Sequence, residues 1–219
     1  DPRGRPLCGL AHGASGVVLA LVEAAAVAPG FGPVPALAVG GLDWESDLFD
    51  SARGWPDLRR EPSEFTWSWC HGGAGATAVR LRLLQLARRG ADLGMPLGVV
   101  QAQAEAGLEL CRAHLRATIA AAAEGMPPRA GLSLCHGLGG ALDALVLGAE
   151  VLGSAELLGE AEAALLAAAA LMGPDVLAWP CGDRQPGSVG LFLGLAGVAV
   201  VAARIAWPQA GIPSPSLLG

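Results

Sequence analysis

Two pairs of adjacent cysteine and histidine residues are the first candidates for chemistry: Cys70-His71 and Cys135-His136, each followed by glycine. Thiolate sulfur and imidazole nitrogen together form a borderline-soft set of ligands that suits Zn²⁺. The pairs lie 65 residues apart, which is not a zinc-finger spacing, so only the fold can bring them together. Their spacing therefore leaves two interpretations open: a shared metal site, or buried free cysteines whose histidines face solvent or a loop carbonyl.

Both pairs belong to an internal repeat with four copies, and the first positions of the copies are separated by 59, 65 and 57 residues. The copies are HGASG (12–16), HGGAG (71–75), HGLGG (136–140) and LGLAG (193–197). A run with high helix propensity follows each copy, at residues 16–28, 76–89, 141–153 and 198–207. Between these runs lie three segments with a polar face at helical spacing, at residues 34–50, 98–123 and 154–172. Each repeat thus predicts one apolar helix and one amphipathic helix.

The repeat predicts an all-α fold, because the chain has no clean apolar–polar alternation and no Asn-Gly or Asp-Gly hairpin turn. A helix that is apolar all round must be covered on every side, whereas an amphipathic helix can face water. We therefore expect an α/α toroid, with inner helices ringed by outer helices and the Gly-rich loops at one end. Four repeats predict an incomplete ring of about four helix pairs. An ordinary helical bundle is the alternative, and the histidine that precedes glycine in three repeats favours the toroid.

Composition excludes several classes of protein. The chain has 219 residues, of which 53% are hydrophobic, with a mean hydropathy of +0.47, so it is not intrinsically disordered. A net charge of −6 and the lack of a dense basic patch argue against nucleic-acid binding. The longest uncharged run, residues 186–203, starts with proline and contains four glycines, so we expect a buried helix and no membrane insertion. Five cysteines without a short-spaced framework, and no secretory signal, favour a cytoplasmic location.

The three histidine-containing loops resemble a known family. The segments GLAHGASG (9–16), SWCHGGAG (68–75) and SLCHGLGG (133–140) are similar to the three signature loops of the lanthionine synthetase C-like (LanC-like) cyclases. Further segments resemble the C-terminal cyclase region of class II (LanM-type) lanthipeptide synthetases, namely residues 42–50, 54–60, 179–182 and 186–218. On this resemblance, residues 1–219 are the C-terminal part of a cyclase domain. We expect the first half of the toroid, and any dehydratase domain, to lie outside the chain.

The resemblance also implies roles for individual residues. Cys70, Cys135 and His136 would hold Zn²⁺ and leave a fourth position open, which is typical of a catalytic zinc. His12 would be the acid/base residue of the pocket. The position of His71 is variable in the family and is not a ligand there. From the residues alone, a Cys₂His₂ site that includes His71 remains an alternative, although adjacent side chains rarely reach one ion together.

The implied function is formation of lanthionine and methyllanthionine rings in a lanthipeptide precursor peptide, which is the expected partner. A cysteine thiolate of the peptide would add to dehydroalanine or dehydrobutyrine, and His12 would donate or accept the proton that this addition requires. The alternative function is a non-catalytic LanC-like scaffold that binds peptides or proteins and holds a structural zinc. A glycosidase with the same fold would need two carboxylates in the pocket, so it ranks last. Without the first half of the ring, we expect the zinc ligands to be retained and the pocket to be incomplete.

Other side chains have structural interpretations. We expect buried, inert thiols at Cys8, Cys111 and Cys181. The two tryptophans beside the second loop, Trp67 and Trp69, are expected to pack around the site. Solvent-facing side chains are expected at His114 and along an acidic helix face made of Asp43, Glu45, Asp47 and Asp50.

Overall fold

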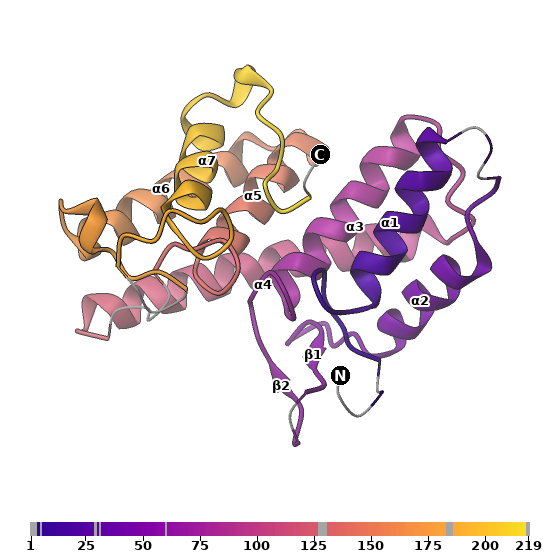
Figure 1. Ribbon diagram of the computed structural model, residues 1–219, viewed down its shortest axis with the longest axis horizontal. Helices are drawn as coiled ribbons and strands as arrows, with labels where there is room; N and C mark the ends of the chain where they lie inside the picture. The colour runs from indigo at the N-terminus through magenta and orange to yellow at the C-terminus, as the bar shows by residue number, and fades with distance from the viewer. Residues whose placement is uncertain are drawn as a thin grey trace. The chain divides into compact units, whose positions relative to one another are not determined.

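A computed structural model of the chain describes Gly4 and residues 6–28, 30, 32–59, 61–126, 131–182 and 186–217. Within these residues the chain is mostly helical (Figure 1), as predicted. Each of the seven predicted helical runs corresponds to one observed helix. The helices are α1 (Ala14–Val27), α2 (Ala36–Asp47), α3 (Gly73–Arg88), α4 (Leu97–Ala123), α5 (Gly139–Leu152), α6 (Ala155–Met172) and α7 (Leu195–Ala206).

Two short strands depart from the expectation of an all-helical chain. β1 (Pro56–Asp57) pairs with β2 (Glu64–Phe65) in antiparallel register, with Pro56 opposite Phe65. Strands of two residues are too short to show alternating hydrophobicity, so the sequence pattern could not reveal them. Two 3₁₀ turns, η1 (Val176–Ala178) and η2 (Pro208–Ala210), complete the described elements.

The chain divides into two compact units. Unit 1 consists of residues 1–66 and 70–110, and unit 2 consists of residues 67–69 and 111–219. In unit 1, α1 packs against both α2 and α3 (Figure 1). In unit 2, α5 packs against α6 and α7, which also contact each other. Three of the four expected helix pairs are formed: α1 with α2, α5 with α6, and α3 with α4, which are joined by the hydrogen bond from Arg80 to Gln103. The fourth apolar helix, α7, is followed in the described residues by η2 alone.

Burial separates the helices largely as predicted. α3 and α5 are buried along most of their length, whereas α2 and α6 each bury only three side chains. α1 and α7 bury a single face, although their sequences are nearly all apolar. The predicted all-round burial of the apolar helices therefore holds for the two middle repeats only. None of the helices among the described residues is both long enough and apolar enough to cross a bilayer.

The four glycine loops share one backbone hydrogen bond, which confirms the internal repeat. In each loop, the N–H two residues after the first repeat position donates to the carbonyl seven residues earlier. These bonds are Ala14 to Leu7 (2.8 Å), Gly73 to Thr66 (2.9 Å), Leu138 to Gly131 (3.0 Å) and Leu195 to Ser188 (2.7 Å). A Cβ atom on Gly72 or Gly194 would overlap the accepting carbonyl, so only glycine fits there. In the third loop the tight glycine is Gly139, two residues further along the repeat, where a Cβ atom would overlap the carbonyl of Leu132.

Candidate metal centre

Trp69, which precedes the second glycine loop in the chain, makes several contacts within unit 2. Its backbone N–H donates to the carbonyl of Cys135 at 2.9 Å, and its indole N–H donates to the carbonyl of Ser216 at 3.0 Å. Its ring stacks on Phe192, with 4.6 Å between the ring centroids. The N–H of Cys135 in turn donates to the carbonyl of Phe192 at 2.8 Å. Because Cys70 follows Trp69 directly in the chain, these contacts bring its thiol to the loop that carries Cys135.

The predicted ligands Cys70, Cys135 and His136 form one group. Their ligand atoms all lie within 4.8 Å of one another, and the two cysteines are buried while His136 is exposed. Two thiols and an imidazole at this separation fit Zn²⁺, which prefers sulfur and nitrogen donors. Of the two interpretations that the spacing left open, the geometry thus favours the shared metal site.

His71 lies apart from this ligand group and contacts His12 instead. The two imidazole rings stack, with centroids 4.4 Å apart and planes inclined by 14°. His71 is buried and His12 is exposed. The loop that carries His12 is also bound to the second loop through the N–H of Ala11, which donates to the carbonyl of Cys70 at 3.2 Å. Among the described residues, the candidate ligand group includes His136 and not His71, so the alternative Cys₂His₂ set is not formed.

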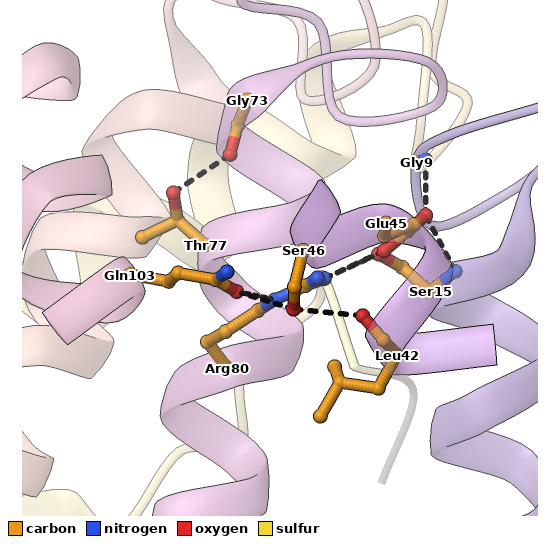
Figure 2. A network of polar contacts seen from close by, with 9 residues as sticks. All are labelled: Gly9, Ser15, Leu42, Glu45, Ser46, Gly73, Thr77, Arg80 and Gln103. Carbon is orange, nitrogen blue, oxygen red and sulfur yellow. Dashed lines mark hydrogen bonds and ion pairs between the residues drawn. The ribbon is translucent and has the colours of Figure 1, made fainter. Parts of the chain in front are cut away.

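The carboxylate of Glu45 binds the loop that carries His12 at one residue before His12 and at one residue after it. One of its carboxylate oxygens accepts the N–H of Gly9 at 3.2 Å and the N–H of Ser15 at 2.9 Å. The other oxygen accepts the Ser15 hydroxyl at 2.5 Å and the guanidinium of Arg80 at 2.7 Å (Figure 2). The expectation of a solvated Glu45 is therefore wrong, because its side chain is fully buried and ion-paired. The neighbouring Asp43 is exposed, as predicted.

The Arg80 side chain extends this network to α4. Its Nε donates to Gln103 at 3.2 Å, and its Nη1 also donates to the Ser15 hydroxyl at 2.7 Å. The guanidinium lies over the ring of Trp55, 4.6 Å from the centroid. The hydroxyl of Ser46 donates to the carbonyl of Leu42 and lies 3.4 Å from Oε1 of Gln103. Figure 2 shows these residues side by side. The network thus joins α2, α3 and α4 within unit 1.

Two charged residues beside the second loop were not singled out by sequence reasoning. Arg59 donates to both carboxylate oxygens of the buried Asp57, at 2.8 and 2.5 Å. These bonds hold the pKa of Asp57 below its usual range, and the charge of His71 adds to the effect. The same partner raises the pKa of Arg59, with a smaller contribution from Cys70. Asp57 and Arg59 therefore belong to the electrostatic surroundings of the candidate centre, and the segment containing them had only a family resemblance to mark it.

The remaining sequence expectations have mixed outcomes. Cys8, Cys111 and Cys181 are buried, as predicted, and are not in disulfides. Burial, together with the nearby charge of Glu45, raises the pKa of Cys8 to about 12. The expectation of a solvated His114 is wrong: its ring lies 6.1 Å from that of Trp67, and burial lowers its pKa.

Comparisons with known proteins agree with these features. The family model described as "Lanthionine synthetase C-like protein" matches residues 1–217. Among solved structures, nisin cyclase matches with a TM-score of 0.61 and 17% sequence identity, over 99% of this chain and 51% of that chain. The likeness shows a shared fold, and this chain spans about half the length of nisin cyclase. No curated protein sequence matches significantly. On the family match, which extends over nearly all of its residues, the chain belongs to the lanthionine synthetase C-like family.

Proposed function

We propose that this chain is part of a cyclase domain that closes lanthionine and methyllanthionine rings in a lanthipeptide precursor. The observation that carries the proposal is the cluster of Cys70, Cys135 and His136, whose ligand atoms lie within 4.8 Å of one another. Family membership supports a peptide substrate and a two-layered ring of helices, of which the three helix pairs and α7 would be a part.

Three protein ligands suit a catalytic zinc better than a structural one, which is closed by four. When bound, Zn²⁺ supplies an acidifying charge that makes a peptide thiol, ordinarily of pKa about 8.5, a thiolate at neutral pH. In the reaction, the peptide thiolate forms a C–S bond to the β-carbon of the dehydroamino acid. The electrons of the C=C bond move to give an enolate, which then takes up a proton at the α-carbon.

His12 is the proposed source of that proton, or the first acceptor of the thiol proton. Imidazole changes charge near neutral pH, which suits it to either role. The bonds from Glu45 to Gly9 and Ser15 fix the loop on both sides of His12, and the ring rests against His71. This support leaves His12 exposed at the loop surface, where a substrate can approach it.

Zinc content tests the ligand set. Purified protein should hold about one zinc per chain, and Cys135→Ala should abolish binding because it removes a thiolate ligand. Cys111→Ala is the matched control, since Cys111, like Cys135, is a buried cysteine of unit 2 that is not in a disulfide. Equal loss of zinc from both variants would contradict the ligand assignment.

His12→Ala separates the cyclase from a non-catalytic scaffold with structural zinc. Because the chain spans about half of nisin cyclase, ring closure is best measured in a protein extended to a complete cyclase domain. Supplied with a dehydrated precursor, His12→Ala should keep its zinc and close rings roughly 10²–10⁴-fold more slowly. Free thiols are counted by alkylation and mass spectrometry. Lost zinc would make His12 a ligand, and unchanged ring closure would remove it from the mechanism.

A further inference from the structure

A fully buried carboxylate, Asp143 on α5, holds the C-terminal segment of the described chain. Its Oδ2 accepts the hydroxyl of Ser214 at 2.6 Å and the N–H of Ser216 at 3.3 Å. Its Oδ1 pairs with the guanidinium of Arg204, which is also buried. Arg204 also donates to the carbonyl of Ile212 at 3.2 Å, so the Asp143–Arg204 pair is hydrogen-bonded to several residues of this segment.

The held segment reaches the candidate metal centre through one hydrogen bond. The carbonyl of Ser216 accepts the indole N–H of Trp69, a residue 147 positions earlier in the chain. A continuous path of bonds thus leads from Asp143, through the backbone of Ser216, to Trp69. All of these residues belong to unit 2, and Cys70 follows Trp69 by a single peptide bond.

This path bears on the position of the Cys70 thiol. Zinc ligands must meet at short, defined distances, so small displacements of one ligand reduce affinity. Groups that orient the metal ligands without binding the metal themselves typically contribute 10–100-fold to metal affinity. The backbone N–H of Trp69 donates to the carbonyl of the ligand residue Cys135, and the indole N–H donates to the carbonyl of Ser216, so both ends of Trp69 are fixed.

We propose that Asp143 is a positioning residue of the metal centre, because it holds Ser214 and Ser216 where they fix Trp69 and thereby Cys70. The proposal rests on the zinc site of the proposed function. It assigns a role to the C-terminal segment that the chemistry of the ligands alone does not indicate.

Trp69→Phe tests the path, because it deletes the indole N–H and leaves a ring to stack on Phe192. Trp179→Phe is the matched control: its indole N–H also donates to a carbonyl of unit 2, that of Gly173 at 2.8 Å, in a different part of the chain from the ligand loops. Zinc affinity, measured by competition with a chromophoric chelator, should fall about tenfold in Trp69→Phe and stay unchanged in Trp179→Phe. The thiolate-to-metal charge-transfer band of the cobalt-loaded protein should change in Trp69→Phe alone.

Ser214→Ala provides a second test that leaves Trp69 intact. It removes the hydroxyl bond to Asp143 and should weaken zinc binding by a smaller factor than Trp69→Phe. Ser154→Ala is its control, because that hydroxyl caps α6 at the N–H of Leu157 instead. Unchanged affinity in both test variants, or an equal fall in the controls, would overturn the positioning role alone. A wild-type protein that binds no zinc would overturn the proposed function with it.

Discussion

Among the described residues, each unit contains one carboxylate–arginine pair in which both side chains are buried, and the two pairs differ in their surroundings. Glu45 and Arg80 in unit 1 are both fully buried, and no second carboxylate is bonded to Arg80 among the described contacts. In unit 2, Arg204 bonds to Asp143 and also to Glu150 at 2.7 Å, whose side chain is 40% exposed. Arg204 therefore has a partner that reaches water, and Arg80 does not.

The two carboxylates nevertheless have a common task. Glu45 accepts backbone N–H groups from the loop of His12, and Asp143 accepts one from the segment that contacts Trp69. Burying an ion pair costs desolvation energy, and that cost is offset only when further hydrogen bonds satisfy the charges. In both units these further bonds fall on a segment beside the candidate centre. The comparison indicates that the buried pairs define loop positions, with the support direct in unit 1 and relayed in unit 2.

Removal of each carboxylate gives the largest expected effect and sharpens this comparison. Glu45→Ala leaves the Arg80 charge buried with neutral partners only and should lower the free energy of unfolding by about 3–5 kcal/mol. Asp143→Ala should cost less, about 2 kcal/mol, because Glu150 still pairs with Arg204. Urea unfolding of the variants measures both.

Glu105→Ala is the control for these substitutions, since Glu105 is exposed and bonds only to Gln101 among the described contacts. Its effect should stay within about 0.5 kcal/mol. A larger loss from Asp143→Ala than from Glu45→Ala would break the comparison, because Glu150 would then give Arg204 no compensation.

Substitution of two helix glycines by alanine should change the stability of the protein by smaller amounts and in opposite directions. A Cβ atom on Gly107 of α4 would overlap the hydroxyl of Thr77 on α3, which donates to the carbonyl of Gly73 at 2.7 Å. Gly107→Ala should therefore destabilise the protein by about 1–3 kcal/mol through overpacking. Gly159 of α6 faces open space, so Gly159→Ala should stabilise by up to about 1 kcal/mol through helix propensity. Thermal unfolding measures both, and a stabilising Gly107→Ala would contradict the close packing of unit 1 around its ion pair.

The ionisation of the Cys8 thiol has the smallest expected effect on stability at neutral pH, and its pKa depends on the charge of Glu45. Its pKa of about 12 lies above the ordinary 9.0, so the neutral thiol stabilises the fold below pH 9 and this contribution is lost as pH rises towards 12. The alkylation rate of Cys8 in native protein, followed by mass spectrometry, should keep rising up to about pH 12. In Glu45→Gln the rise should shift to lower pH, because a charge that opposes ionisation is gone. An unchanged profile would exclude Glu45 as a cause.

The helices could be predicted from the sequence because each apolar run has a helical length and starts at a glycine loop. The position of Glu45 was predicted wrongly: Asp43 and Asp47 lie four residues apart on one helix face, and Glu45 lies between them on the opposite face, which is buried. Its partner could not be predicted, because a buried arginine in an apolar helix indicates a carboxylate without indicating which one.

The candidate site likewise has features that the sequence predicted and features that it did not. The ligands follow from loop motifs, whereas the contact of Trp69 with Ser216 joins residues 147 positions apart and has no local sequence pattern. The two-residue strands that carry Asp57 and Phe65 are likewise set by tertiary packing, since so short a strand has no pattern of its own.

The fourth glycine loop separates two kinds of information in the repeat. It has Leu193 where the other loops have histidine, yet it keeps the same seven-residue closure, and Gly197 meets the carbonyl of Leu191 as Gly16 meets that of Leu10. The glycines therefore encode the shape of the loop, and the cysteines and histidines encode its chemistry. A copy of the repeat can therefore lack the cysteine and histidine and still form the glycine loop. Members of such a fold that have lost their chemistry would then be recognised by the spacing of their glycines alone.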